Sequence, residues 1–203
     1  MKIDEFWENI HKENNILYLS GHSGITVLRG LFLVDFVDQL VPQESRILEI
    51  GVGLGICTKD LHDLGFKVDC VEISKEAVDR VYHLVDTSYT PDGLYCMDSE
   101  AYDLAISYCV TQHINDESLQ EQLKEVIRAL KKTGIFAMQY SWPFEGYPKL
   151  QRFEEMASGS CNRPIEKMYQ MVEDAGGKIV DSRIFSVSPQ YKAGWGILHI
   201  MRK

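Results

Sequence analysis

The spacing of apolar residues changes near residue 46 of the chain. Before it, Phe6, Trp7 and Ile10 recur at helical intervals, and so do the apolar residues of 27–36. A loop rich in small and polar residues, 18–24, separates these two segments, and Pro42 ends the second. The pattern predicts an N-terminal helical cap over residues 1–45.

From Arg46 onward, short apolar runs alternate with amphipathic segments. The predicted strands are 47–50, 67–73, 94–97, 104–107, 134–140, 178–185 and 196–201, and the predicted helices are 57–64, 75–84, 118–130 and 165–175. Alternation of this kind favours a mainly parallel sheet with helices on both faces. Only a turn around Pro189 separates the last two strands, so we expect a hairpin that places an antiparallel strand in the sheet.

No repeat or linker divides the chain, which predicts one domain over residues 1–203, with a core over 46–203 and a lid segment at 141–164. Ligands of open parallel sheets bind beyond the carboxyl ends of the strands. We therefore expect the functional residues just after Ile50, Ile73, Met97, Ser107 and Tyr140.

Composition and charge narrow the function. Hydrophobic residues make up 45% of the chain, charged residues 25%, and the formal net charge is -9. This acidic balance disfavours nucleic acid as a partner. The five cysteines lie far apart without zinc-ligand spacing, so no metal is expected. The polar N-terminus is not a secretory signal and no apolar run approaches a membrane span, so we expect a cytoplasmic protein with no membrane contact.

A glycine loop follows the first predicted strand. Gly51, Gly53 and Gly55 stand at alternate positions, which allows a sharp turn and a close approach by a ligand. A tight turn without a ligand is the alternative interpretation. Dinucleotide sites favour the spacing Gly-x-Gly-x-x-Gly, and the Glu49 carboxylate would repel a pyrophosphate but suits the cationic amino group of an amino-acid cofactor. Glu72, at the end of the second strand, can accept both hydroxyls of a ribose or lie in solvent.

The runs LEIGVGLG, VEIS and YDLAISYCVTQHI resemble the class I S-adenosylmethionine-dependent methyltransferases. The resemblance extends from about Arg46 to the C-terminus. It implies a Rossmann-like three-layer sandwich, with a seven-stranded, mainly parallel sheet whose last strand is antiparallel. It also implies S-adenosylmethionine as the cofactor.

Carried over by position, the resemblance implies a cofactor site formed by Glu49, Gly51, Gly53, Gly55, Glu72, Ile73, Asp98, Ser99, Ser107 and Tyr108. In this assignment Glu49 orients the methionine amino group and the glycines leave room for the methionine and the sugar. Glu72 holds the ribose, and Ile73 packs on the adenine. Asp98, with Ser99 beside it, meets the adenine amino group, although the segment that follows is shorter than is usual in the family. The residues after the fourth strand line the cofactor near its sulfonium.

Several residues are candidates for the acceptor side. His113, just beyond the fourth strand, is the first candidate for a general base, and a structural role is its alternative. His22, with Tyr18 in the same N-terminal loop, is the second candidate, unless it is a solvated loop histidine. Trp142 and Tyr147 offer flat apolar surfaces for a substrate, although packing of a lid explains them equally well.

The sequence therefore predicts methyl transfer to a hydroxyl or amine of a small metabolite or saccharide. Ser107-Tyr108-Cys109-Val110 replaces the Asp/Asn-Pro-Pro-Tyr/Phe motif with which methyltransferases grip planar nitrogens of bases or glutamine. This replacement also disfavours a nucleic-acid substrate. A non-catalytic S-adenosylmethionine-binding protein and, less favoured, an NAD-dependent oxidoreductase are the alternatives. The oligomeric state is left open.

Overall fold

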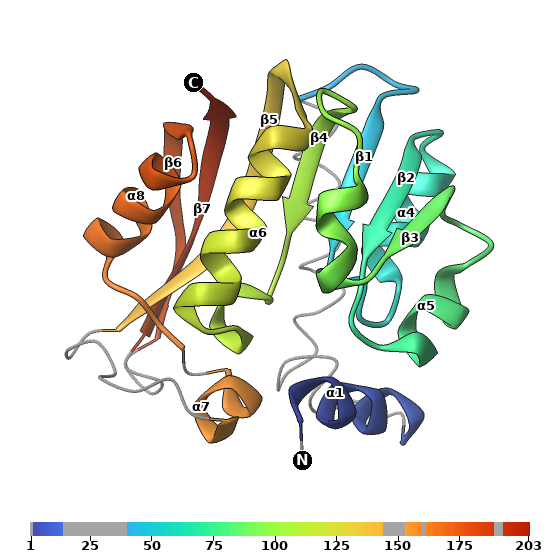
Figure 1. The fold of residues 1–203 in the computed structure, drawn as a ribbon, viewed down its shortest axis with the longest axis horizontal. Helices are drawn as coiled ribbons and strands as arrows, with labels where there is room; N and C mark the ends of the chain where they lie inside the picture. The colour runs from blue at the N-terminus through green and yellow to red at the C-terminus, as the bar shows by residue number, and fades with distance from the viewer. Residues whose placement is uncertain (1, 14–39, 144–152, 160, 189–192) are drawn as a thin grey trace. The chain divides into compact units, whose positions relative to one another are not determined.

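The computed structural model describes residues 2–13, 40–143, 153–159, 161–188 and 193–203 (Figure 1). Its helices are α1 (Ile3–Lys12), α4 (Ile56–Asp63), α5 (Lys75–Val81), α6 (Asp116–Ala129), α7 (Phe153–Ser158) and α8 (Ile165–Asp174), with 3-10 helices η1 (Pro91–Cys96) and η2 (Thr111–His113). Its strands are β1 (Arg46–Ile50), β2 (Lys67–Val71), β3 (Thr87–Tyr89), β4 (Tyr102–Ser107), β5 (Leu130–Pro143), β6 (Gly177–Ser188) and β7 (Ala193–Arg202). Among these residues no helix is long and apolar enough to cross a membrane.

The seven strands form a sheet in the order β3-β2-β1-β4-β5-β7-β6. Strand β7 is antiparallel to both of its neighbours, β5 and β6, whereas β1–β2, β2–β3 and β4–β5 pair in parallel. The predicted hairpin and the mixed sheet are therefore confirmed. The chain divides into two compact units, residues 1–94 and 95–203, which are described separately below.

The first unit contains β1, β2 and β3 with helices α1, α4 and α5 (Figure 1). Strands β1 and β2 run parallel in the register Ile50↔Val71, so their carboxyl ends lie side by side. Four consecutive residues are buried at the end of each strand, as expected for a parallel sheet covered on both faces. Helix α5 begins at a serine N-cap, because the Ser74 hydroxyl accepts a hydrogen bond from the Ala77 amide at 3.2 Å.

The second unit contains β4 to β7 with helices α6, α7 and α8 (Figure 1). Helix α6 begins where the Asn115 side chain accepts a hydrogen bond from the Ser118 amide at 2.8 Å. Its apolar face, which includes Leu119, Leu123 and Val126, is fully buried. Helix α8 ends before Gly176, whose φ of 82° confirms the predicted stop.

One predicted element is wrong. The third strand is Thr87–Tyr89, whereas 94–97 falls largely in the 3-10 helix η1. Pro91 has no amide hydrogen for a ladder, while the β-branched and aromatic residues just before it suit a strand. The predicted helix at 27–36 lies outside the described residues, and the single-domain organisation stays a prediction.

Candidate functional site

The glycine loop joins β1 to α4. Gly51, Gly53 and Gly55 all have positive φ angles, of 78°, 55° and 77°, which favour glycine. A Cβ at Gly55 would lie 2.5 Å from the Val81 side chain, so this glycine lets α5 pack closely. A Cβ at Gly53 would meet no atom of the described residues within 4 Å. Gly53 therefore borders space that a ligand could occupy.

Backbone and side-chain hydrogen bonds hold this loop in place. The Gly51 amide donates to the Val71 carbonyl at 2.8 Å, and the Gly53 amide approaches Glu72 Oε2 at 3.5 Å. The Gly53 carbonyl accepts from Arg80 Nη1 at 3.2 Å. The loop is thus attached to the end of β2 and to α5, so its shape is set before a ligand arrives.

Glu49 is a buried carboxyl group two residues before the loop. It is 4% exposed, and its Oε2 has no hydrogen-bond partner among the residues that the structure describes. Burial raises the pKa of Glu49 to about 8, the Thr58 hydroxyl opposes this rise, and the negative charge of Glu72 adds to it. A buried acid with an unused oxygen is chemically suited to a cationic ligand, because the cation would compensate the buried charge.

Glu72 directly follows β2 and is 7% exposed. Its Oε1 accepts hydrogen bonds from the amides of Ile73, at 2.8 Å, and Ser74, at 2.9 Å. Burial raises the pKa of this carboxyl, while the Ser74, Gly53 and Ile73 amides oppose the rise. The amides fix the orientation of the carboxylate, as a ribose-binding acid requires.

A cavity of about 200 Å³ adjoins Glu72. It is lined by Glu72, Ile73, Lys75, Val78, Ser88, Tyr89 and Thr90, from the ends of β2 and β3 and the first turns of α5. Apolar and polar groups both line it, and its volume is smaller than that of most small-molecule pockets. Ile73, expected to pack on an adenine, is one of its walls.

The residues predicted to follow the third strand lie farther from it than expected, and their cofactor role stays a prediction. Asp98 and Ser99 follow η1 and are exposed, and the Ser99 hydroxyl accepts a hydrogen bond from Arg128 at 2.8 Å. With β3 ending at Tyr89, the first acid after the third strand is Asp92. The run Thr-Ser-Tyr before Pro-Asp-Gly could have indicated this strand and its turn, but the longer apolar run at 94–97 outweighed it.

Helix α1 is attached to the same unit by side-chain contacts that sequence reasoning missed. Glu8 accepts hydrogen bonds from the Ser74 hydroxyl at 2.7 Å and the Glu76 amide at 3.1 Å, at the start of α5. Ser74, the Glu76 amide and Lys12 lower the pKa of Glu8 to about 2, although desolvation opposes them. His11 lies 3.3 Å from Arg80 Nη1, the atom that also donates to Gly53.

In the second unit, β4 ends at Ser107. This side chain is 1% exposed, and its hydroxyl has no hydrogen-bond partner among the described residues. Tyr108 is half-buried, and Cys109 turns the chain with a φ of 59° while its amide donates to Gln139 Oε1 at 2.7 Å. The predicted cofactor residues after the fourth strand thus lie at the carboxyl end of β4, as expected.

His113 lies in η2, and its ring contacts α7. Its Nδ1 is 2.8 Å from the Met156 carbonyl, and since a carbonyl can only accept, Nδ1 carries the proton. Burial lowers the pKa of His113 to about 4, although the bond to Met156 opposes this, so the ring is neutral at pH 7. A Cβ at Gly159 would lie 2.8 Å from His113 Cε1. The ring is thus packed between the loop and the end of α7.

The aromatic candidates divide between packing and undescribed positions. The Trp142 ring lies 5.3 Å from the Tyr140 ring, and a Cβ on Gly194 would approach within 2.2 Å of it. Trp142 therefore packs across β7, and a role in substrate binding stays a prediction. Tyr18, His22 and Tyr147 lie outside the described residues.

Comparisons with known proteins agree with this arrangement. A family model described as a methyltransferase domain matches residues 48–138. No curated protein sequence matches the chain.

Solved structures share the fold. A TehB-like S-adenosylmethionine-dependent methyltransferase from Corynebacterium glutamicum is 15% identical with a TM-score of 0.68, over 97% of this chain and 98% of that one. An S-adenosylmethionine-dependent methyltransferase from Leishmania major is 15% identical with a TM-score of 0.74, over 98% of this chain and 81% of that one. Phosphoethanolamine N-methyltransferase 2 from Haemonchus contortus is 16% identical with a TM-score of 0.71, over 100% of this chain and 60% of that one.

The matched residues contain the end of β1, the glycine loop, Glu49, Glu72 and the end of β4. The buried carboxyl groups and the open space at Gly53 fit the cofactor of that family. The methyltransferase-domain model over residues 48–138 and the shared fold therefore support an S-adenosylmethionine-dependent methyltransferase with S-adenosylmethionine as its cofactor.

Proposed function

We propose that this enzyme methylates a hydroxyl or an amine of a small metabolite or saccharide. The net charge of -9 and the sequence Ser-Tyr-Cys-Val after β4 favour a small acceptor over a nucleic acid. The Haemonchus contortus enzyme of the same fold is named for phosphoethanolamine and is bound to phosphomonomethylethanolamine, which is an acceptor of this size class.

We further propose which residues hold the cofactor. Glu49 binds the methionine ammonium group, and the backbone of Gly51, Gly53 and Gly55 cradles the methionine and the sugar. Glu72 accepts the ribose hydroxyls, and Ile73 packs on the adenine in the adjoining cavity. Ser107 and Tyr108 line the sulfonium. Asp98 and Ser99 are candidates for the adenine edge, and Asp92, the first acid after β3, is a further one. When bound, the cofactor would supply an electrophilic methyl group on its sulfonium sulfur, with S-adenosylhomocysteine as the leaving group.

On the acceptor side, the protein aligns the acceptor and excludes water. An unprotonated amine needs only alignment, whereas a hydroxyl must lose its proton to a base. His113 is neutral at pH 7, but a pKa of about 4 makes it a weak base. His22, Tyr18, Trp142 and Tyr147 remain candidate residues of the acceptor side.

One observation carries the assignment of the cofactor site. It is the buried Glu49 carboxyl with an unused oxygen, two residues before a loop whose central glycine borders open space. A tight turn that bound no ligand would not require an unpaired acid beneath it, because burial of such a group is costly.

Calorimetric titration with S-adenosylmethionine and S-adenosylhomocysteine tests the site. We expect the wild type to bind with micromolar affinity. Glu49→Gln, which keeps the shape of the side chain but not its charge, should lower that affinity by more than about tenfold. Asp63→Asn, an exposed acid on α4, is the matched control and should bind as the wild type does. Equal affinity in Glu49→Gln would refute the assigned site. A panel of hydroxyl and amine metabolites with labelled methyl donor then identifies the acceptor.

A further inference from the structure

Arg163 is a buried cation that none of the sequence motifs indicated. Its side chain is 1% exposed, and it is the largest fully buried side chain among the described residues. A buried guanidinium is tolerated only where its donors are satisfied. Its hydrogen bonds therefore show which parts of the chain it holds.

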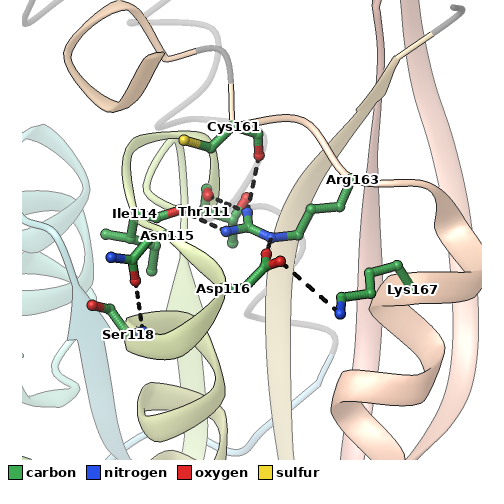
Figure 2. Close-up of polar contacts among 8 residues, drawn as sticks. All are labelled: Thr111, Ile114, Asn115, Asp116, Ser118, Cys161, Arg163 and Lys167. Carbon is green, nitrogen blue, oxygen red and sulfur yellow. Dashed lines mark hydrogen bonds and ion pairs between the residues drawn. The ribbon is translucent and has the colours of Figure 1, made fainter. Parts of the chain in front are cut away.

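Figure 2 shows the guanidinium surrounded by four oxygen acceptors. Nε donates to Asp116 Oδ1 at 2.7 Å, and Nη2 donates to the Ile114 carbonyl at 2.6 Å. Nη1 donates to the carbonyls of Thr111, at 2.7 Å, and Cys161, at 2.9 Å. Three of these four acceptors lie in residues 111–116, the loop that follows β4 and carries His113.

Two further hydrogen bonds join this loop to the segment 156–163. The Cys161 amide donates to the Gln112 carbonyl at 3.0 Å, and His113 Nδ1 donates to the Met156 carbonyl at 2.8 Å. The Arg163 amide itself donates to the Ser141 carbonyl at 3.1 Å, near the end of β5. Arg163 is thus the point at which the loop after β4, the end of β5 and the segment after α7 meet.

We propose that Arg163 is a positioning residue for the acceptor side of the site, and that its guanidinium sets where His113 and α7 lie. In this arrangement His113 connects the loop to α7 through Met156. The location of this loop on the acceptor side rests on the proposed function, but the arrangement itself can be measured without any acceptor.

The geometry requires an arginine. A planar guanidinium presents donors in several fixed directions, whereas a lysine ammonium is a compact point charge. Lysine at this position could keep the pair with Asp116 but could not reach both ends of the 111–116 loop at once. Lys167, 4.0 Å from Asp116 on the solvent side, provides a matched control, because it contacts the same carboxylate without touching the loop carbonyls in Figure 2.

The test measures the His113 ring pKa by NMR titration and the amide exchange of residues 154–159. We expect Arg163→Lys and Arg163→Met to raise the His113 pKa from about 4 toward its ordinary value of 6.5, because water reaches the loosened ring. Exchange of the α7 amides should accelerate at least about tenfold. Lys167→Ala should change neither quantity. Asp116→Asn, at a carboxyl that is 35% exposed, should also raise the His113 pKa and speed amide exchange in α7. This variant replaces the Arg163 variants in the test if they do not fold.

The outcomes separate this proposal from the proposed function. Wild-type values of both quantities in a folded Arg163→Lys, or in Asp116→Asn where the Arg163 variants do not fold, would overturn the positioning role whatever the cofactor result. Failure of the wild type to bind S-adenosylmethionine and S-adenosylhomocysteine would overturn the proposed cofactor site, while the measured dependence of His113 on Arg163 would stand.

Discussion

At the scale of single residues, the site depends on how burial changes ordinary side chains. Glu49 is buried and His113 is partly buried, and desolvation moves both pKa values toward the neutral form. Glu49 needs a cation to become charged. His113 needs no further proton to hold Met156.

Cofactor binding should depend on pH through Glu49. Below pH 8 the free enzyme holds a proton on Glu49 that must leave when the ammonium group binds, so affinity should rise up to about tenfold per pH unit. Above about pH 8 the α-amino group of the cofactor, with an ordinary pKa of about 7.7–8.0, loses its own proton and affinity should fall. Titration calorimetry from pH 6 to 9 should show a maximum near pH 8. A flat profile would contradict the role of Glu49.

Gly53→Val should abolish cofactor binding and leave the fold intact. A Cβ at this position would meet no described residue within 4 Å, so we expect the added side chain to displace the ligand rather than protein. The positive φ of 55° adds some backbone strain, about 1 kcal/mol. Calorimetry and circular dichroism check the two expectations, with Gly65→Val, another positive-φ glycine without near neighbours, as the control for strain alone. Retained affinity would place the cofactor elsewhere.

Two substitutions of His113 distinguish a general base from a connection to α7. The amide of His113→Asn can still donate to the Met156 carbonyl but cannot accept a proton, whereas His113→Ala loses both functions. If His113 connects the loop to α7, the His113→Asn variant should keep methyl-transfer activity within about threefold of the wild type. The His113→Ala variant should lose more activity than that. If it is the base, both should fall by about 10²–10⁴-fold. Rates with labelled cofactor and the acceptor from the metabolite panel decide between them.

At the scale of elements, α1 is coupled to the glycine loop. Arg80 contacts His11 of α1 and the Gly53 carbonyl, while Glu8 accepts hydrogen bonds at the start of α5. Burial and the charge of Arg80 lower the pKa of His11 to about 4, with Glu8 opposing, so a neutral imidazole faces the guanidinium at pH 7. One arginine therefore links the position of a helix to the shape of a binding loop.

This link predicts effects in both directions, because coupling between two sites is reciprocal. Binding of S-adenosylhomocysteine should slow amide exchange in α1. Arg80→Met should speed amide exchange in α1 and lower the affinity for S-adenosylhomocysteine by about tenfold. Hydrogen exchange and calorimetry measure the two halves. Lys59→Met, an exposed cation on α4, should leave both unchanged. Lower affinity for S-adenosylhomocysteine in Arg80→Met, with unchanged amide exchange in α1, would show that Arg80 acts on the loop alone.

At the scale of the whole molecule, the cofactor site should lower the stability of the ligand-free enzyme. The pKa of Glu49 is raised on folding, so its contribution to stability is fully present below pH 4.5 and is lost as the pH rises toward 8. Glu49→Gln should therefore stabilise the ligand-free protein at pH 8 by on the order of 2 kcal/mol, with little effect at pH 4.5. Thermal unfolding at both pH values checks this. Equal or lower stability of the variant at pH 8 would contradict it.

The sequence by itself determined the order of most elements and the location of the glycine loop. These depend on local properties: the apolar period along each segment, and glycines that permit positive φ at Gly51, Gly53 and Gly55. Glu72 could be predicted for the same reason, since it directly follows a strand.

Only the tertiary structure decided which short run became the third strand and what surrounds each titratable group. Thr87–Tyr89 is a strand because it pairs with β2, and three residues carry too little pattern to outweigh a longer apolar run elsewhere. The raised pKa of Glu49, the bond from His113 to Met156 and the burial of Arg163 each depend on partners brought together from distant positions. Burial and hydrogen-bond geometry arise from packing, and no local pattern encodes them.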